Sequence, residues 1–118
     1  MPNKWDIPQT LEDKIRKRDQ QCVYCGVAFK KCLPGSGGRK RTATWEHIDN
    51  DAKNISEHNI VLCCSACNSS KGAKRLIAWL EAPYCTDLKR NINRNTVAPV
   101  VKRWLRNYIR AQGGGLRR

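Results

Sequence analysis

The chain has 118 residues, which is the usual length of one domain. It carries 23 lysine and arginine residues against 10 acidic ones, so its net charge is +13. A charge of this size favours a polyanionic partner, most simply nucleic acid. Because the sequence shows no signal-peptide pattern and no apolar run of about twenty residues, we expect a cytoplasmic protein without a membrane-spanning helix.

The N-terminal part of the chain predicts a basic helix and a basic loop. The helix spans residues 10–19, and its predicted cap is Thr10 with Asp13 at the capping-box position. A short Cys-Val-Tyr-Cys-Gly knuckle follows at residues 22–26. Residues 30–41 contain glycine, proline and serine with basic side chains at both ends, and we expect this loop to be ordered by an anion.

Two strands and two helices are predicted in the rest of the chain. β-branched and aromatic residues predict a strand at 42–48, and apolar residues on both faces predict a second strand at 59–64. One helix begins after Ser-Ala-Cys-Asn and ends at Pro83. The last helix spans residues 97–112, where an apolar stripe indicates a core face or a dimer face. We therefore expect a monomer or a homodimer.

Four of the seven cysteines form two Cys-x-x-Cys pairs: Cys22 with Cys25, and Cys64 with Cys67. Two such pairs in one small domain are typical of a structural Zn²⁺ site with four sulfur ligands. Cys63 is an alternative partner for the second pair. Adjacent residues of a strand point to opposite faces, however, so we interpret Cys63 as a buried packing residue. The remaining two cysteines, Cys32 and Cys85, are not spaced like metal ligands.

A candidate catalytic group lies just ahead of the second cysteine pair. His47 follows Glu46, and Asn68 directly follows Cys67 in the first turn of the predicted helix. Amide and carboxylate oxygens are hard ligands that suit Mg²⁺ or Mn²⁺, which leaves a neutral His47 as a base for phosphodiester hydrolysis. We interpret the other histidine, His58, as structural or exposed.

The pattern CVYCG … WEHI … NIVLCCSACNSSKG resembles the HNH endonuclease family, in the form with a ββα-metal finger and a four-cysteine zinc site. The resemblance covers about residues 18–74. It implies a zinc-stapled α+β fold, with a ββα-metal (His-Me finger) core at about 18–82 of a single domain over 1–118. A basic helix at 10–19 and a C-terminal helical extension at 86–112 flank this core.

The resemblance also implies roles for individual residues. His47 is the general base, and Glu46 and Asn68 are ligands of a catalytic Mg²⁺ or Mn²⁺. Asn59 is the middle asparagine, which pins the loop between the strands and orients the histidine. Contacts to nucleic acid are expected from basic residues in and beyond the finger: Lys71, Lys74, Arg39, Lys40 and Arg41.

Two departures from the family pattern concern the site. The family usually has aspartate where this chain has Glu46. Because the side chains of neighbouring residues on a regular strand point apart, Glu46 and His47 can bind one metal only where the strand ends or bends. Asp49 and Asp51 are alternative ligands, and Glu46 has the alternative of pairing with a surface lysine. The usual proline and two glycines after the histidine are replaced, which changes the loop at 49–59.

The implied function is a metal-dependent DNA endonuclease, encoded by a bacterium or phage, that leaves 5′-phosphate and 3′-hydroxyl ends. One finger holds one active site and cuts one strand, so double-strand cutting needs a dimer or two successive events. The alternative is a non-catalytic, zinc-stabilised module that binds nucleic acid. That module explains the charge and the cysteines but leaves Glu46, His47 and Asn68 without a role.

Overall fold

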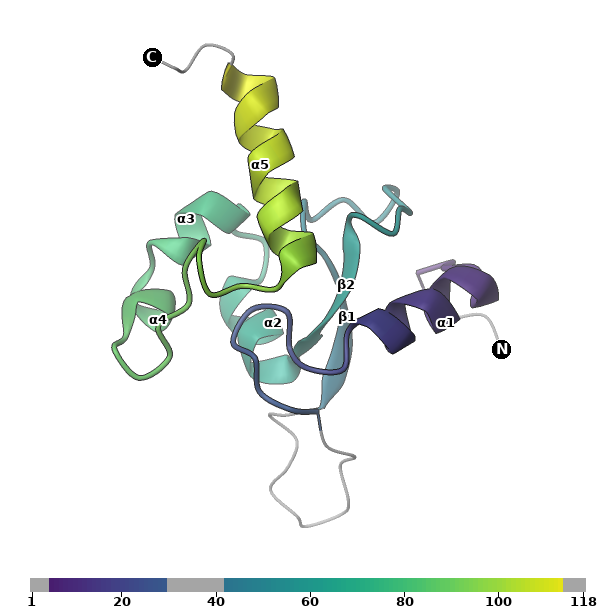
Figure 1. The fold of residues 1–118 in the computed structure, drawn as a ribbon, viewed down its shortest axis with the longest axis horizontal. Coiled ribbons are helices and arrows are strands. Elements are labelled where there is room, and N and C mark those ends of the chain that lie inside the picture. Colours follow the sequence, from purple (N-terminus) through teal and green to yellow (C-terminus); the bar gives the residue numbers. More distant parts are fainter. Residues whose placement is uncertain (1–4, 30–41, 114–118) are drawn as a thin grey trace.

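A computed structural model of the chain describes residues 5–29 and 42–113 (Figure 1). Within these residues the helices and strands follow in the order α1, β1, β2, α2, α3, α4, α5. Helix α1 covers Gln9–Arg18, and strands β1 and β2 cover Ala43–His47 and Ile60–Cys64. The later helices α2 to α5 cover Ser65–Lys71, Leu76–Leu80, Pro83–Thr86 and Pro99–Gly113. In the described ranges, no helix combines the length and the apolar character that a membrane crossing needs.

Strands β1 and β2 form a two-stranded antiparallel sheet, directly followed by α2. His47 pairs with Ile60, and Glu46 pairs with Val61. Because successive side chains of a strand alternate between faces, His47 and Glu46 lie on opposite faces of the sheet. Every residue of β2 is buried, which confirms the predicted strand with apolar side chains on both faces.

Helix α1 covers the face of the sheet that carries His47 (Figure 1). Ile15 of α1 is fully buried and packs with Ile60 and Leu62 of β2. The sheet therefore has a small apolar core of its own on this side, separate from the main core.

The start of α1 corrects the predicted cap. The helix begins at Gln9, because the carbonyl of Pro8 accepts a hydrogen bond from the amide of Glu12 at 2.9 Å and closes the first turn there. Thr10 consequently lies inside the helix. Asp13 accepts a hydrogen bond from Nε2 of Gln9 at 2.8 Å instead of completing a capping box.

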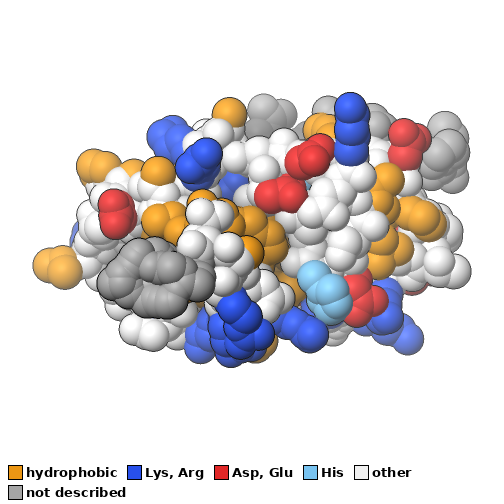
Figure 2. Space-filling view, turned by 90° about the horizontal axis from the view of Figure 1, so that it is seen from above, with side chains coloured by type: hydrophobic (Ala, Val, Ile, Leu, Met, Phe, Trp, Pro, Cys, Tyr) orange, Lys and Arg blue, Asp and Glu red, His pale blue; other side chains and the backbone are white. Residues whose placement is uncertain are grey.

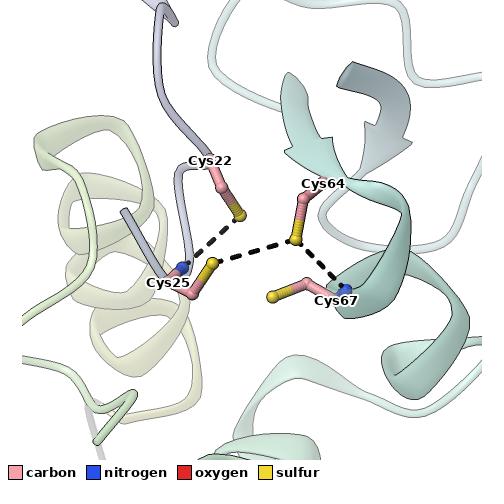
Figure 3. Close-up of side chains that lie close together, drawn as sticks. All are labelled: Cys22, Cys25, Cys64 and Cys67. Carbon is pink, nitrogen blue, oxygen red and sulfur yellow. Dashed lines mark hydrogen bonds between the residues drawn. The ribbon is translucent and has the colours of Figure 1, made fainter. Parts of the chain in front are cut away.

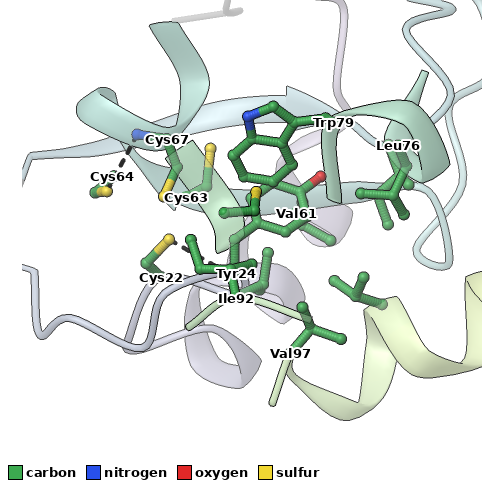
Figure 4. Packing of buried hydrophobic residues seen from close by; sticks show 14 of the residues in the cluster. Cys22, Tyr24, Val61, Cys63, Cys64, Cys67, Leu76, Trp79, Ile92 and Val97 are labelled. Carbon is green, nitrogen blue, oxygen red and sulfur yellow. Dashed lines mark hydrogen bonds between the residues drawn. The ribbon is translucent and has the colours of Figure 1, made fainter. Parts of the chain in front are cut away.

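The main hydrophobic core lies on the other face of the sheet, where Figure 4 shows Tyr24, Val61 and Trp79 packed together. Trp79 of α3 is fully buried, and its rings meet the Tyr24 ring edge-on with centroids 5.0 Å apart. Val101 and Leu105 at the start of α5 complete this core. The outer part of α5 extends away from the body (Figure 1). The predicted apolar stripe is therefore a core face over its first turns.

The single helix predicted up to Pro83 is divided in the structure. Helix α2 ends at Lys71 and α3 begins at Leu76. Gly72 has φ 49° and ψ −128°, a conformation that only glycine adopts readily, and it turns the chain between the two helices. Pro83 occupies the first turn of a further short helix, α4, where its fixed φ is favourable.

Candidate functional site

Four cysteine sulfurs converge where the knuckle meets the start of α2 (Figure 3). The Sγ atoms within 4.8 Å of one another are those of Cys22, Cys25, Cys64 and Cys67. Those of Cys25 and Cys64 are 3.8 Å apart, which is the edge of a tetrahedron with metal–sulfur bonds of about 2.3 Å. The predicted pairing of the cysteines is confirmed, and the cluster is compatible with a bound metal ion such as Zn²⁺.

Backbone amides hold these sulfurs in position for a metal. Sγ of Cys22 accepts hydrogen bonds from the amides of Tyr24 and Cys25 at 3.4 Å, and Sγ of Cys64 accepts one from Cys67 at 3.5 Å. Hydrogen bonds of this kind favour the thiolate, which is the form that binds metal. The pKa of Cys22 is lowered to about 7, mainly by a side-chain hydrogen bond with the Cys25 thiol.

The other described cysteines lie outside this cluster. Cys63 is fully buried in the main core, and its Sγ lies 3.7 Å from Oγ1 of Thr44. Burial raises the pKa of the Cys63 thiol, and it raises the pKa of the Cys85 thiol to about 11. Cys63 is therefore a packing residue, as predicted, and Cys85 is a second one. Cys32 lies outside the described residues.

A cavity of about 260 Å³ lies beside β1 and the turn that follows α2. His47 and Asn68 both line it, so the structure brings the predicted base and the predicted amide ligand together. Glu46, Asn50 and Gly72 also line the cavity.

The imidazole of His47 is held with its Nε2 buried and unpartnered within the described ranges. The side chain is buried, and its Nε2 has no hydrogen-bond partner among the described residues. The ring meets the rings of Trp5 edge-on with centroids 5.2 Å apart. Burial lowers the pKa of His47 below its ordinary 6.5, so the neutral imidazole predominates at pH 7. A neutral imidazole is the form that accepts a proton.

The loop after His47 is fixed by Asn59. Its Oδ1 accepts a hydrogen bond from the amide of Asp49 at 3.1 Å, and its Nδ2 donates to Oδ1 of Asp49 and to the carbonyl of Asn54 at 3.0 and 3.1 Å. Asn59 thus has the loop-pinning contacts that the resemblance implies. Asp49 and Asp51, the alternative ligands, are exposed and are not among the residues that line the His47 cavity.

Glu46 is buried and lies within a hydrogen-bond network on the sheet face opposite His47. Its Oε2 accepts hydrogen bonds from the hydroxyl of Tyr24 and from Nζ of Lys71, both at 2.9 Å. Burial raises the pKa of the Tyr24 phenol well above its usual value, so this hydroxyl stays protonated and donates. Both contacts are made to Oε2.

The position of Lys71 differs from the prediction. Its side chain has no exposed surface, and Nζ lies 2.9 Å from Oε2 of Glu46 and 2.7 Å from Oδ1 of Asn50. The amine therefore has its partners inside the protein and is not placed to contact phosphate. The alternative that Glu46 pairs with a lysine is the arrangement found, with a buried lysine in place of a surface one.

Sequence reasoning missed Tyr24 and Asn50, which complete the network around Glu46 and Lys71. Asn50 has φ 64°, and its Nδ2 donates to the carbonyls of Ala73 and Lys74 at 3.1 and 2.9 Å. Asparagine tolerates this left-handed conformation better than most residues, which is the only local signal for its role. For Tyr24 the only local signal is its position between Cys22 and Cys25 of the knuckle.

The predicted nucleic-acid contacts beyond the cavity are placed only in part. Lys74 is exposed, and its Nζ donates to the carbonyl of Ser70 at 3.1 Å. Arg39, Lys40 and Arg41 lie outside the described residues.

No known family model, curated protein or solved structure matches the chain. The cysteine cluster and the His47 cavity are therefore interpreted from their own residues and geometry.

Proposed function

We propose that the chain is a metal-dependent HNH endonuclease that hydrolyses phosphodiester bonds of DNA and leaves 5′-phosphate and 3′-hydroxyl ends. The observation that carries the proposal is a buried, neutral His47 whose Nε2 has no partner within residues 5–29 and 42–113, in a cavity that Asn68 also lines. A buried polar atom left unpaired costs about 1–3 kcal/mol, so it is expected where a reactant binds.

His47 acts in this proposal as the general base. Its imidazole accepts a proton from a water molecule as that water attacks the phosphorus atom. The edge-on contact with Trp5 and the loop held by Asn59 keep the imidazole in place, since the carbonyl of Asn59 accepts a hydrogen bond from Ile48 at 2.9 Å, directly after His47. A positioned base loses little entropy when the reaction begins.

Glu46 and Asn68 would hold a divalent cation. Nδ2 of Asn68 donates to Oγ1 of Thr44 at 2.8 Å and to the carbonyl of Trp45 at 3.2 Å, so the amide is fixed and its Oδ1 is left for the cation. Two oxygen ligands of this kind fit Mg²⁺ or Mn²⁺, ions that keep several water ligands in protein sites. When bound, such a cation supplies stabilisation for the charge on the phosphate and the leaving oxygen.

The net charge of +13 supports a nucleic-acid substrate. Lysine and arginine side chains appear at several separate places on the face shown in Figure 2. Exposed basic residues continue along α5: Lys102, Arg103, Arg106 and Arg110. A distributed surface of this kind binds the phosphate backbone and carries no sequence information by itself.

Incubation of the purified protein with supercoiled plasmid tests the proposal. Relaxed circles should form with Mg²⁺ or Mn²⁺ and not without added divalent metal. DNA ligase alone should reseal the nicks, because 5′-phosphate and 3′-hydroxyl ends need no further treatment. If the protein binds the plasmid but leaves it supercoiled with both metals, the non-catalytic nucleic-acid-binding module is the correct alternative and the nuclease proposal fails.

A further inference from the structure

A larger cavity, of about 390 Å³, lies next to the His47 cavity. It is lined by the residues that follow His47, by the start of α3 and by the outer part of α5. Its lining includes Ile48, Asp49, Asn50, Arg75, Trp104 and Tyr108. Asn50 also lines the His47 cavity, so the two cavities adjoin at this residue.

Two aromatic rings form the α5 side of this cavity. Trp104 and Tyr108 are one helical turn apart, with centroids separated by 5.2 Å and ring planes inclined by only 8°. Both side chains are only partly buried, unlike Val101 and Leu105 on the same helix, which belong to the core. The outer face of such a stacked pair can bind the π face of any nucleobase.

Polar groups lie on the other side of the same cavity. Arg75 is exposed, and its guanidinium has no hydrogen-bond or ion-pair partner in the described part of the chain. A guanidinium fork matches the oxygens of a phosphate group. The cavity thus combines a stacking surface with an unpaired cation. Both lie in the cavity that shares Asn50 with the His47 cavity.

We infer that this cavity is a subsite for one unpaired nucleotide adjacent to the phosphate that is cut. The base stacks on the outer face of the Trp104–Tyr108 pair, and its phosphate lies on Arg75. The inference rests on the proposed function, because the His47 cavity defines which phosphate is cut. A base inside a duplex has both faces covered by its neighbours, so the subsite selects single-stranded DNA or a duplex with an unpaired nucleotide.

Binding measurements in a His47→Ala background test the subsite without cleavage. Fluorescence anisotropy with a labelled 12-residue single strand and the matching duplex is carried out with no added divalent cation. Trp104→Ala should weaken single-strand binding by about 5- to 150-fold, the range measured for loss of one stacked base, and should change duplex binding by less than about twofold. Trp104→Phe should restore most of the affinity, because it keeps an aromatic face.

Two further variants and a second ligand control this experiment. Ile109→Ala removes an apolar side chain of the same helix that is 38% exposed and outside the cavity, and it should leave both affinities unchanged. Arg75→Gln should reduce the salt dependence of single-strand binding by about one ion. An abasic oligonucleotide, which has the backbone but no bases, should bind equally to the protein with Trp104 and to the Trp104→Ala variant. This control shows whether the effect of Trp104 depends on a stacked base.

Equal weakening of single-strand and duplex binding by Trp104→Ala, or no weakening at all, overturns the subsite. A dimer that dissociates in Trp104→Ala while the single-strand affinity stays the same also overturns it. Failure of the nuclease proposal is distinguishable, because a chain that binds single strands through Trp104 but never nicks DNA keeps the subsite. A chain that nicks DNA but binds single strands equally well with and without Trp104 keeps the nuclease proposal and loses the subsite.

Discussion

Nζ of Lys71 lies 2.9 Å from Oε2 of Glu46, and both side chains are buried. The same carboxylate oxygen accepts a hydrogen bond from Tyr24, which stands between two cysteines of the metal-compatible cluster. The ion pair therefore joins the knuckle, β1 and α2 at the residue directly before His47. This arrangement connects the structural cluster to the cavity in which the candidate base lies.

Replacement of Lys71 should destabilise the protein strongly. Lys71→Met leaves the carboxylate of Glu46 buried without its counter-ion, and we expect the free energy of unfolding to fall by about 3–5 kcal/mol in urea denaturation. The control is Lys74→Met, which removes an exposed amine three residues later and should change stability by no more than about 0.5 kcal/mol.

Removal of both charges distinguishes the ion pair from the packing of the lysine stem. The double variant Glu46→Gln with Lys71→Met should recover most of the lost stability, because a buried ion pair contributes little more than apolar groups of similar volume. A loss for Lys71→Met no larger than that for Lys74→Met contradicts the buried pair.

The cysteine cluster predicts which thiols retain metal. The wild-type protein should hold one Zn²⁺ per chain through dialysis, because the four sulfurs form a single cluster. Cys64→Ser should lose the ion and unfold the knuckle region, whereas Cys63→Ser should keep it, since Cys63 lies in the core. Metal analysis of the two purified variants is the measurement, and the reverse result would show that the wrong cysteine of this adjacent pair is assigned to the cluster.

The amide of Asn68 should matter for catalysis far more than for the fold. Asn68→Ala is expected to slow plasmid nicking by at least about 100-fold, since a cation ligand is lost, and to lower stability by about 1 kcal/mol through its lost hydrogen bonds. Ser69→Ala changes the exposed neighbour on α2 and should leave the nicking rate unchanged. Similar rates for Asn68→Ala and wild type are incompatible with Asn68 as a ligand.

Gly72 gives a test of the turn between α2 and α3 that depends on the sign of the effect. An added Cβ would meet no atom nearer than 3.8 Å, so space is not the obstacle, but φ of 49° is unfavourable for alanine. Gly72→Ala should therefore destabilise the protein by about 1–3 kcal/mol. In one continuous helix the same change should stabilise by about 1 kcal/mol instead, so denaturant midpoints with unchanged slopes decide between the two arrangements.

Local sequence patterns predicted the strands and the cysteine cluster well. Two matched Cys-x-x-Cys pairs have few geometric solutions, and the alternation along β2 was enough to separate Cys63 from Cys64. The predicted strand at 42–48 exceeds the observed Ala43–His47 by one residue at each end, and the predicted strand at 59–64 begins one residue before the observed Ile60–Cys64. These features depend on neighbours in the sequence, which is why they are predictable.

The features that sequence patterns missed depend on distant partners. Lys71 has the local appearance of a solvated helix residue. Its burial is made favourable by the carboxylate of Glu46, 25 positions earlier on β1, and by the amide oxygen of Asn50. Asn50 joins the same network through a left-handed backbone that no periodicity predicts. The division of the helix at Gly72 is also a tertiary effect, since it lets Trp79 enter the core and donate to Oγ of Ser70 at 2.9 Å.

A comparison of the two histidines tests directly whether His47 is the catalytic base. Plasmid relaxation with Mg²⁺ or Mn²⁺ is measured for wild type, His47→Ala and His58→Ala, purified identically. His47 is buried in the cavity and His58 is exposed outside it, so we expect His47→Ala to lose at least about 100-fold in rate and His58→Ala to match wild type. Equal rates for wild type and His47→Ala would contradict the assignment of His47 as the catalytic base.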